Sequence, residues 1–283
     1  MIRSIAFLAA ALFASATHAE TYADASRIVT VGGPVTEIVY ALGEEDRIIA
    51  RDTTSVFPAE ANALPDVGYM RRLSAEGVLS VAPDLIIARS TSGPIEAIDQ
   101  LKSASIPIVF VEDTFTAEAV IEAINTVGTA LGATEKSEAL AADVQADLDR
   151  LAAKVSDLEA QQRVLFILSM DGGRVNAAGS GTGANGIIEL AGGINVMAES
   201  YSGYKLVDAE AIIEAAPDVV LMMDGRGNHS GRKEEVLSLP AIALTPAGQN
   251  DGFITVPGAA LGFGPRTGQL GLELHDSLYG GAG

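Results

Sequence analysis

The chain contains one helix–turn–strand unit written twice. Residues 74–87 (SAEGVLSVAPDLII) match residues 208–221 (DAEAIIEAAPDVVL) without a gap at a constant offset of 134, and five of the fourteen positions are identical. Each copy starts with an N-cap residue and breaks at Ala-Pro-Asp, where proline pushes the preceding residue out of the α region. This density of matches favours duplication over coincidence. We therefore expect two homologous lobes.

Short apolar runs alternate with longer amphipathic or alanine-rich segments in both halves. The runs are rich in β-branched residues and lack strict alternation, as buried parallel strands do. The expected strands are 28–31, 48–50, 85–88, 108–111, 164–168, 219–222 and 253–256. The expected helices are 35–42, 74–81, 94–102, 186–191 and 209–215. This order predicts an α/β fold of two Rossmann-like αβα lobes with parallel sheets.

The middle of the chain has the composition of one long helix. Residues 134–162 contain no glycine or proline and are dense in Ala, Leu, Glu and Lys, which favour helices. We assign residues 20–133 to an N-terminal lobe, 134–162 to the linking helix and 163–283 to a C-terminal lobe. Because interfaces between domains are preferred ligand sites, we expect a ligand cleft between the lobes.

The first nineteen residues have the pattern of a cleaved export signal. Arg3 precedes an apolar run over 5–13, and residues 17–19 (THA) fit a signal-peptidase site. That run is shorter than the roughly 20 apolar residues that cross a bilayer. We expect cleavage after Ala19 and a periplasmic protein with no stable membrane insertion.

Composition excludes several classes of function. The absence of cysteine removes disulfides, thiolate metal sites, cysteine catalysis and a lipid-attachment cysteine. The net charge of −19 opposes binding to nucleic acid. His229 and His275 are too few for a zinc site, and no Gly-x-Ser-x-Gly nucleophile elbow occurs. We expect a monomeric binding protein rather than an enzyme, with an exported hydrolase as the alternative.

One loop places a tyrosine beside two arginines. Asp66 and Gly68 predict a turn, so Tyr69 lies on a loop just before a helix, followed by Arg71 and Arg72. A tyrosine phenolate binds ferric iron in some haem proteins, and a neighbouring guanidinium would stabilise that anion. Packing or a simple hydrogen bond at the surface is the alternative.

Two acidic residues occupy the same position in the two copies of the repeat. Glu76 and Glu210 each fall in the first turn of a helix, where a carboxylate interacts favourably with the helix dipole. That effect alone explains both residues. A symmetric pair of exposed acids could also dock onto basic pockets of a two-fold membrane partner.

The chain resembles the periplasmic haemin-binding proteins of bacterial haem-uptake ABC importers, within the helix-linked class that also binds cobalamin and ferric siderophores. The resemblance runs from about Arg27 to the C-terminus. The segments that show the resemblance are RIVTVGG (27–33), VGYMRRLSAEG (67–77), PDLI (83–86), LPAIALTPAG (239–248) and LGFG (261–264). The Gly-Tyr-x-Arg-x-Leu run is the most specific for haemin within the class.

The resemblance implies roles for the residues singled out above. Tyr69 would be the axial ligand of ferric haem, Arg71 would hold its phenolate, and Arg72 would support the ligand. Glu76 and Glu210 would dock on the importer permease. Cobalamin or a ferric siderophore on the same fold is the closest alternative, and a haem sensor or chaperone outside transport is another.

Two second-lobe residues carry the rest of the predicted site. Arg226 lies in a loop and could pair with a haem propionate. Asp171 stands where some relatives have a histidine in a Ser-His-Gly-Gly turn, and a carboxylate is a poorer haem ligand. We predict five-coordinate ferric haem or a weak sixth ligand, and leave open a second haem in the cleft.

Overall fold

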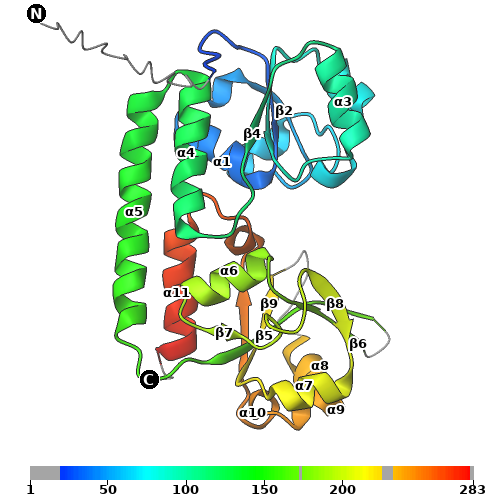
Figure 1. Cartoon of the computed structure of the whole chain (residues 1–283), viewed down its shortest axis with the longest axis vertical. Coiled ribbons are helices and arrows are strands. Elements are labelled where there is room, and N and C mark those ends of the chain that lie inside the picture. The colour runs from blue at the N-terminus through cyan, green and yellow to red at the C-terminus, as the bar shows by residue number, and fades with distance from the viewer. Residues whose placement is uncertain (1–19, 172–173, 225–231, 281–283) are drawn as a thin grey trace, which may run out of the picture.

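Two α/β lobes stand one above the other beside a layer of long helices (Figure 1). The computed structural model describes residues 20–171, 174–224 and 232–280. The helical layer consists of α4 (Ala117–Leu131), α5 (Thr134–Ser156) and α11 (Thr267–Tyr279). The predicted class, two α/β lobes connected by a long helix, is confirmed.

Lobe 1 is built on a four-stranded sheet in the order β2-β1-β3-β4. Every pairing in it is parallel, as predicted, and strands β1 and β3 are fully buried. Its elements are β1 (Ile28–Val31), α1 (Gly33–Ala41), β2 (Ile48–Arg51), α2 (Ala75–Ser80), β3 (Leu85–Arg89), α3 (Ile95–Ser103) and β4 (Ile108–Val111), with short 3-10 turns η1 (Glu45–Arg47), η2 (Ala59–Ala63) and η3 (Met70–Arg72).

Lobe 2 is built on a six-stranded sheet in the order β10-β9-β5-β6-β8, with β7 also paired to β5. Its strands are β5 (Arg163–Asp171), β6 (Arg174–Ala178), β7 (Ile194–Asn195), β8 (Tyr204–Val207), β9 (Val219–Met223) and β10 (Phe253–Val256). Its other elements are α6 (Gly183–Leu190), α7 (Ala209–Ala215), α8 (Arg232–Leu237), α9 (Pro240–Ala243), α10 (Pro246–Gln249) and η5 (Gly258–Leu261).

The second sheet is mixed, which the sequence analysis did not predict. Strands β5 and β6 pair antiparallel, and so do β6 and β8. Only two residues connect β5 to β6, and so short a connection permits only antiparallel pairing. The parallel part of the sheet is β10, β9, β5 and β7.

The two copies of the repeat fold in the same way. The N-cap Ser74 of α2 and the N-cap Asp208 of α7 each accept a hydrogen bond from the backbone N–H of the third helical residue. Ala82 and Ala216, which precede the two prolines, have positive φ angles of 48° and 41° and so lie outside the right-handed helical region of backbone conformations. The duplicated sequence therefore encodes a duplicated cap and a duplicated helix stop.

The linking helix α5 begins at the predicted residue, Thr134, and ends at Ser156 rather than Gln162. It lies against α4 and α11 (Figure 1). A Cβ on Gly268 of α11 would lie 2.6 Å from the Cβ of Asp147 on α5, so only glycine permits this close approach. The largest buried apolar cluster runs from lobe 1 through these helices into lobe 2.

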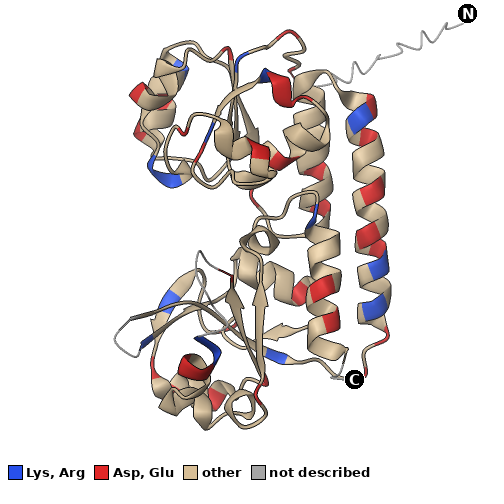
Figure 2. Ribbon diagram, turned by 180° about the vertical axis from the view of Figure 1, so that it is seen from behind, with Lys and Arg blue, Asp and Glu red and all other residues tan. Residues whose placement is uncertain are grey.

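Acidic side chains are spread over both lobes and along α5 (Figure 2). They account for the net charge of −19, which favours solubility and opposes anionic surfaces. No helix within the described ranges combines the length and the apolar character needed to cross a membrane.

A bidentate ion pair joins the lobes. Arg266, just before α11, donates from Nε and Nη2 to the two carboxylate oxygens of Glu37 on α1, at 2.8 and 3.0 Å. The guanidinium also stacks on the ring of Phe57, 3.5 Å from its centroid. Glu37 is 8% exposed, while the side chain of Arg266 is 28% exposed, so the pair is partly shielded from solvent and its geometry satisfies both charges.

Breaking this pair should destabilise the protein. We expect Glu37→Gln and Arg266→Gln each to lower the free energy of unfolding by about 2 kcal/mol, since each leaves a charged partner unpaired. The double variant should lose less than the sum of the two. Urea denaturation monitored by circular dichroism measures all four proteins.

The exposed pair between Lys154 and Asp276, which also joins two helices, is the matched control. Lys154→Met should cause no measurable loss, because exposed ion pairs contribute little. A loss for Lys154→Met equal to that of Arg266→Gln would contradict the role given to the buried pair.

Candidate functional site

A cavity of about 710 Å³ lies between the lobes. Lobe 1 supplies residues that follow the carboxyl ends of its strands, and lobe 2 supplies the end of β9 and the turn after β10. The lining residues are Gly33, Pro34, Glu37, Thr54, Val56, Phe57, Tyr69, Met70, Arg89, Met223, Asp224, Pro257, Gly258, Ala259, Leu261, Gly262, Gly264 and Arg266. The carboxyl ends of parallel strands are the usual ligand edge of such sheets.

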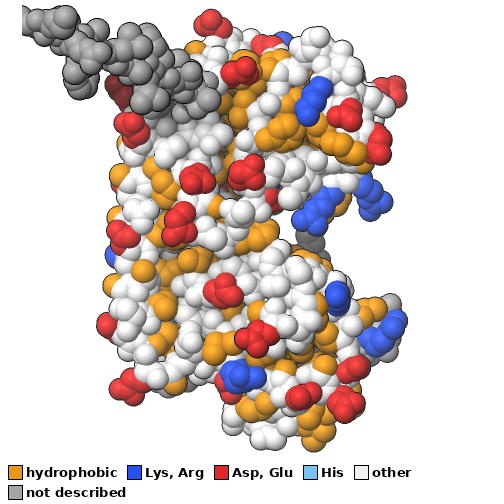
Figure 3. Space-filling model, in the orientation of Figure 1, with side chains coloured by type: hydrophobic (Ala, Val, Ile, Leu, Met, Phe, Trp, Pro, Cys, Tyr) orange, Lys and Arg blue, Asp and Glu red, His pale blue; other side chains and the backbone are white. Residues whose placement is uncertain are grey.

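The molecule is hollowed between the lobes on the side away from α5 (Figure 3). Lys and Arg side chains stand at the upper and lower margins of this hollow. On a chain with net charge −19, such a local group of cations is what an anionic ligand would need.

The structure places Tyr69 on the wall of this cavity. Its side chain is 40% exposed and makes no hydrogen bond to any described residue. Tyr69 comes directly before the 3-10 turn η3, whose Met70 is buried beneath the loop. A phenol that is open to a cavity and has no protein partner is available to a ligand.

Val56 and Phe57 form an apolar part of the wall, at 46% and 42% exposure. The sequence analysis did not identify them. Their loop is held by Asp52, which is fully buried and accepts from Gly32 N at 2.9 Å and from Thr54 N at 3.0 Å. The Asp-Thr-Thr-Ser run after β2 is typical of such a side-chain-capped turn. This run is the sequence signal from which the loop could have been predicted.

Two arginines on the cavity wall, Arg89 and Arg266, were not predicted from the sequence, and both are paired within the protein. Arg266 binds Glu37, as described above, while Arg89 forms an ion pair with Asp113 and donates to Gly262 O at 3.0 Å. Burial lowers the pKa of Arg89 to about 10, with a further contribution from the charge of Arg71. Arg89 is therefore still a cation at neutral pH, and its charge is balanced within the protein.

Arg71 and Arg72 are exposed on η3 and are not among the described residues that line the cavity. Arg71 nevertheless lies within electrostatic range of lobe 2. Burial raises the pKa of Tyr204 on β8, and the positive charge of Arg71 opposes this rise. The two arginines next to Tyr69 thus lie outside the described wall of the cavity, while the charge of Arg71 still acts on Tyr204.

Of the remaining predicted residues, Glu76 and Glu210 are not among the described residues that line the cavity. Glu76 and Glu210 are exposed in the first turns of α2 and α7. Asp171 is the last residue of β5, opposite Arg174. Arg226 lies outside the described residues.

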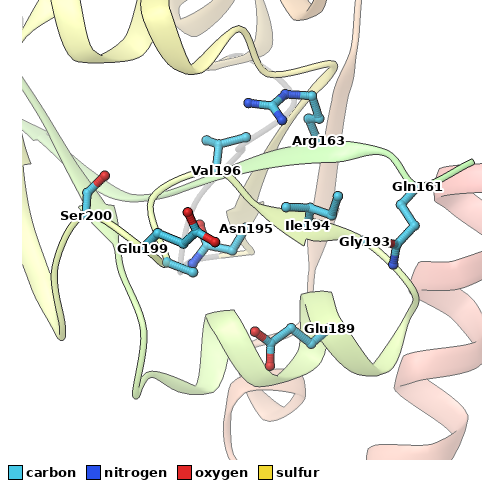
Figure 4. A pocket seen from close by; sticks show the side chains of 10 residues that line it. Gln161, Arg163, Glu189, Gly193, Ile194, Asn195, Val196, Glu199 and Ser200 are labelled. Carbon is cyan, nitrogen blue, oxygen red and sulfur yellow. The ribbon is translucent and has the colours of Figure 1, made fainter.

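A second hollow, of about 520 Å³, lies on lobe 2 near the start of β5 (Figure 4). The side chains of Glu189 and Glu199 come from two different segments, while Arg163 Nη2 donates to Ala215 O at 2.8 Å. Its lining residues are Gln161, Arg163, Glu189, Gly193, Ile194, Asn195, Val196, Ala198, Glu199 and Ser200. It contains none of the predicted site residues and lies at the amino end of β5, away from the ligand edge of the sheet.

The chemistry of the cavity between the lobes suits a large, partly apolar ligand. Apolar side chains dominate its wall, and a single phenol and two methionines, Met70 and Met223, add polarisable groups. Pockets of this kind bind small molecules through shape, with a few polar groups that fix orientation. Across the described ranges, no group of three or more His, Asp or Glu side chains could hold a bare metal ion.

The chain has sequence relatives among the substrate-binding proteins of ABC transporters and among vitamin B12-binding proteins. The chain is 30% identical to an uncharacterized ABC transporter substrate-binding lipoprotein, YvrC, of Bacillus subtilis, over 70% of this chain and 64% of that protein, so it spans less than two thirds of that relative. It is 26% identical to the vitamin B12-binding protein of Vibrio parahaemolyticus over 78% of each chain.

Solved structures match over nearly the whole fold. The periplasmic heme-binding protein RhuT from Roseiflexus sp. RS-1, in apo form, superposes with a TM-score of 0.84 at 34% identity, covering 90% of this chain and 98% of that chain. The periplasmic heme-binding protein BhuT, in complex with two hemes, has a TM-score of 0.84 at 35% identity, covering 89% and 97%.

The sequence profile of the periplasmic binding proteins matches residues 28–260. This span takes in both sheets and most of the residues that line the cavity between them. The chain therefore belongs to the periplasmic binding protein family, as a two-lobed solute-binding protein with its cavity between the lobes.

Proposed function

We propose that this protein captures ferric haem between its lobes and delivers it to an ABC importer permease. The observation that carries the proposal is the exposed phenol of Tyr69 on the cavity wall. A phenolate is an established protein ligand of ferric haem iron. Haem brings its own iron, so the protein needs to supply only an axial ligand and an apolar slot.

The cavity wall supports this ligand. Val56 and Phe57 on lobe 1 and Met223 on lobe 2 present apolar surface to the same space, where the faces of a porphyrin would be removed from water. Such burial contributes roughly 25 cal/mol per Å² of apolar surface. Arg89 and Arg266 on the cavity wall are paired inside the protein, so we propose that Arg71 stabilises the Tyr69 phenolate and that Arg72 supports the ligand.

Two further residues of lobe 2 complete the proposed site. Arg226 would pair with a propionate, and Asp171 would stand near the face opposite Tyr69 without binding the iron strongly. We therefore propose five-coordinate ferric haem. The core shared between the lobes and the ion pair between Glu37 and Arg266 favour a lobe closure of small amplitude.

Cobalamin is the second candidate ligand, because vitamin B12-binding proteins are among the sequence relatives. Haem is favoured by the similar folds of heme-binding proteins at 34% and 35% identity and by the phenol in the cavity. Titration separates the two ligands, since only haem would give a Soret shift that depends on Tyr69.

Delivery requires a docking surface, and we propose Glu76 and Glu210 for it. Both carboxylates are exposed at equivalent places on the two lobes, so they could meet two basic pockets of a two-fold permease. We also propose that residues 1–19 direct export to the periplasm. We further propose that residues 20–133 form the N-terminal lobe, residues 134–162 the link and residues 163–283 the C-terminal lobe.

Tyr69→Ala should abolish tight haem binding. Titration of the mature protein with ferric haem should saturate for the wild type and show phenolate-to-iron charge-transfer bands. The variant should lose those bands and bind at least about tenfold more weakly, a loss of about 1.4 kcal/mol. Tyr40→Phe, which alters a partly buried tyrosine of α1 away from the cavity, is the control. Unchanged affinity in Tyr69→Ala would refute the site.

Charge reversal at the docking acids should separate binding from delivery. We expect Glu76→Lys together with Glu210→Lys to leave the haem affinity unchanged and to abolish uptake by the cognate permease reconstituted in vesicles, because like charges repel. The control is a second double variant, Glu118→Lys with Glu138→Lys, which makes the same change of charge on α4 and α5 and should leave uptake unchanged. Equal uptake by both double variants would contradict the docking role.

A further inference from the structure

The loop that carries Tyr69 is held by the carboxylate of Asp66, a residue for which the sequence predicted only a turn and which the proposed site does not include. We propose that Asp66 is a positioning residue, which fixes the backbone turn that aims the Tyr69 phenol into the cavity. This inference rests on the proposed function and deepens it, because it explains how an exposed side chain keeps one direction.

Asp66 lies in a segment that extends the sheet of lobe 1. Strand β2 is the edge of that sheet, and Arg51 at its end donates from its backbone N to Pro65 O at 2.9 Å, while Val67 N donates to Arg51 O at 3.0 Å. Asp66 is bridged to Arg51 in parallel register. The segment before Tyr69 is therefore attached to the sheet rather than loose.

The carboxylate of Asp66 bonds to three separate groups. Its Oδ1 accepts from Gly68 N at 2.8 Å and from Thr53 Oγ1 at 3.1 Å. Its Oδ2 accepts from Arg51 Nη1 at 2.8 Å. Arg51 is only 9% exposed and also donates to Asp52 O at 3.0 Å. A nearly buried cation thus fixes the carboxylate, which in turn fixes the N–H of the residue before Tyr69.

Gly68 is the point at which the chain turns toward the cavity. Its φ is +100°, a conformation that glycine adopts without strain, and its carbonyl accepts from Thr53 N at 3.0 Å. Both of its backbone polar groups are therefore held, the N–H by Asp66 and the carbonyl by Thr53. Without the hydrogen bond from Gly68 N to Asp66, only the carbonyl of Gly68 would be held, and the backbone angles of glycine are otherwise little restricted.

The other side of Tyr69 is fixed independently of Asp66. Arg72 N donates to Tyr69 O at 2.7 Å, and Gly93 N donates to Met70 O at 2.9 Å. The Tyr69 side chain itself has no hydrogen bond within the described residues, so its direction follows from its backbone. Asp66 is not among the described lining residues of the cavity, so it acts through Tyr69 rather than by touching the ligand.

The test compares Asp66→Ala with wild type by ferric haem titration of the mature protein. We expect the haem affinity to fall about tenfold, in line with the loss of charge-assisted hydrogen bonds, and the phenolate charge-transfer band to shift or broaden. Asp66→Asn, which keeps an oxygen for the Gly68 N–H, should recover most of the affinity. Asp99→Ala removes an exposed carboxylate of α3 and should leave both readouts unchanged.

A double-variant cycle separates positioning from general damage to the lobe. In a Tyr69→Phe background, Asp66→Ala should cause no further loss of haem affinity, because its effect passes through the phenol. An equal loss in that background, or an unchanged affinity and band in Asp66→Ala alone, would overturn the inference. Failure of the wild type to bind haem would instead overturn the proposed function, so the two failures are distinguishable.

Discussion

The lobes are held together by one shared apolar core and, on the wall of the cavity, by the ion pair between Glu37 and Arg266. These contacts set the width of the cavity, since its two walls belong to different lobes. Because the core continues through the helices beside the cavity, large separation of the lobes would expose apolar surface to water. A small closure around the ligand costs less than a wide opening.

The arginines on the cavity wall differ from the cations at the margins of the hollow in how their charge is balanced. Arg89 and Arg266, which line the cavity, are neutralised by Asp113 and Glu37 within the protein. Other Lys and Arg side chains stand at the margins of the hollow between the lobes (Figure 3). Among the described residues, the positive charge that an anionic ligand would meet therefore lies mainly at these margins.

Two aspartates that follow β2 organise the ligand-facing loops of lobe 1. Asp52 holds the turn before Val56 and Phe57, and Asp66 holds the turn before Tyr69. Both accept backbone N–H groups, so each converts a flexible loop into a defined surface. The side chains that face the cavity make few contacts of their own, which leaves them available to a ligand.

The sequence by itself determined the features that depend on neighbouring residues: the duplicated unit with its caps and proline stops, the start of α5 at Thr134, and the loop that presents Tyr69. Such features follow from local backbone preferences, which are contained entirely within a short segment of sequence. Only the tertiary structure decided the pairing of β8 with β6, the packing of α4 against α5, and the pairing of Glu37 with Arg266 across 229 residues. Contacts between distant segments depend on how whole lobes pack, and no local pattern records them.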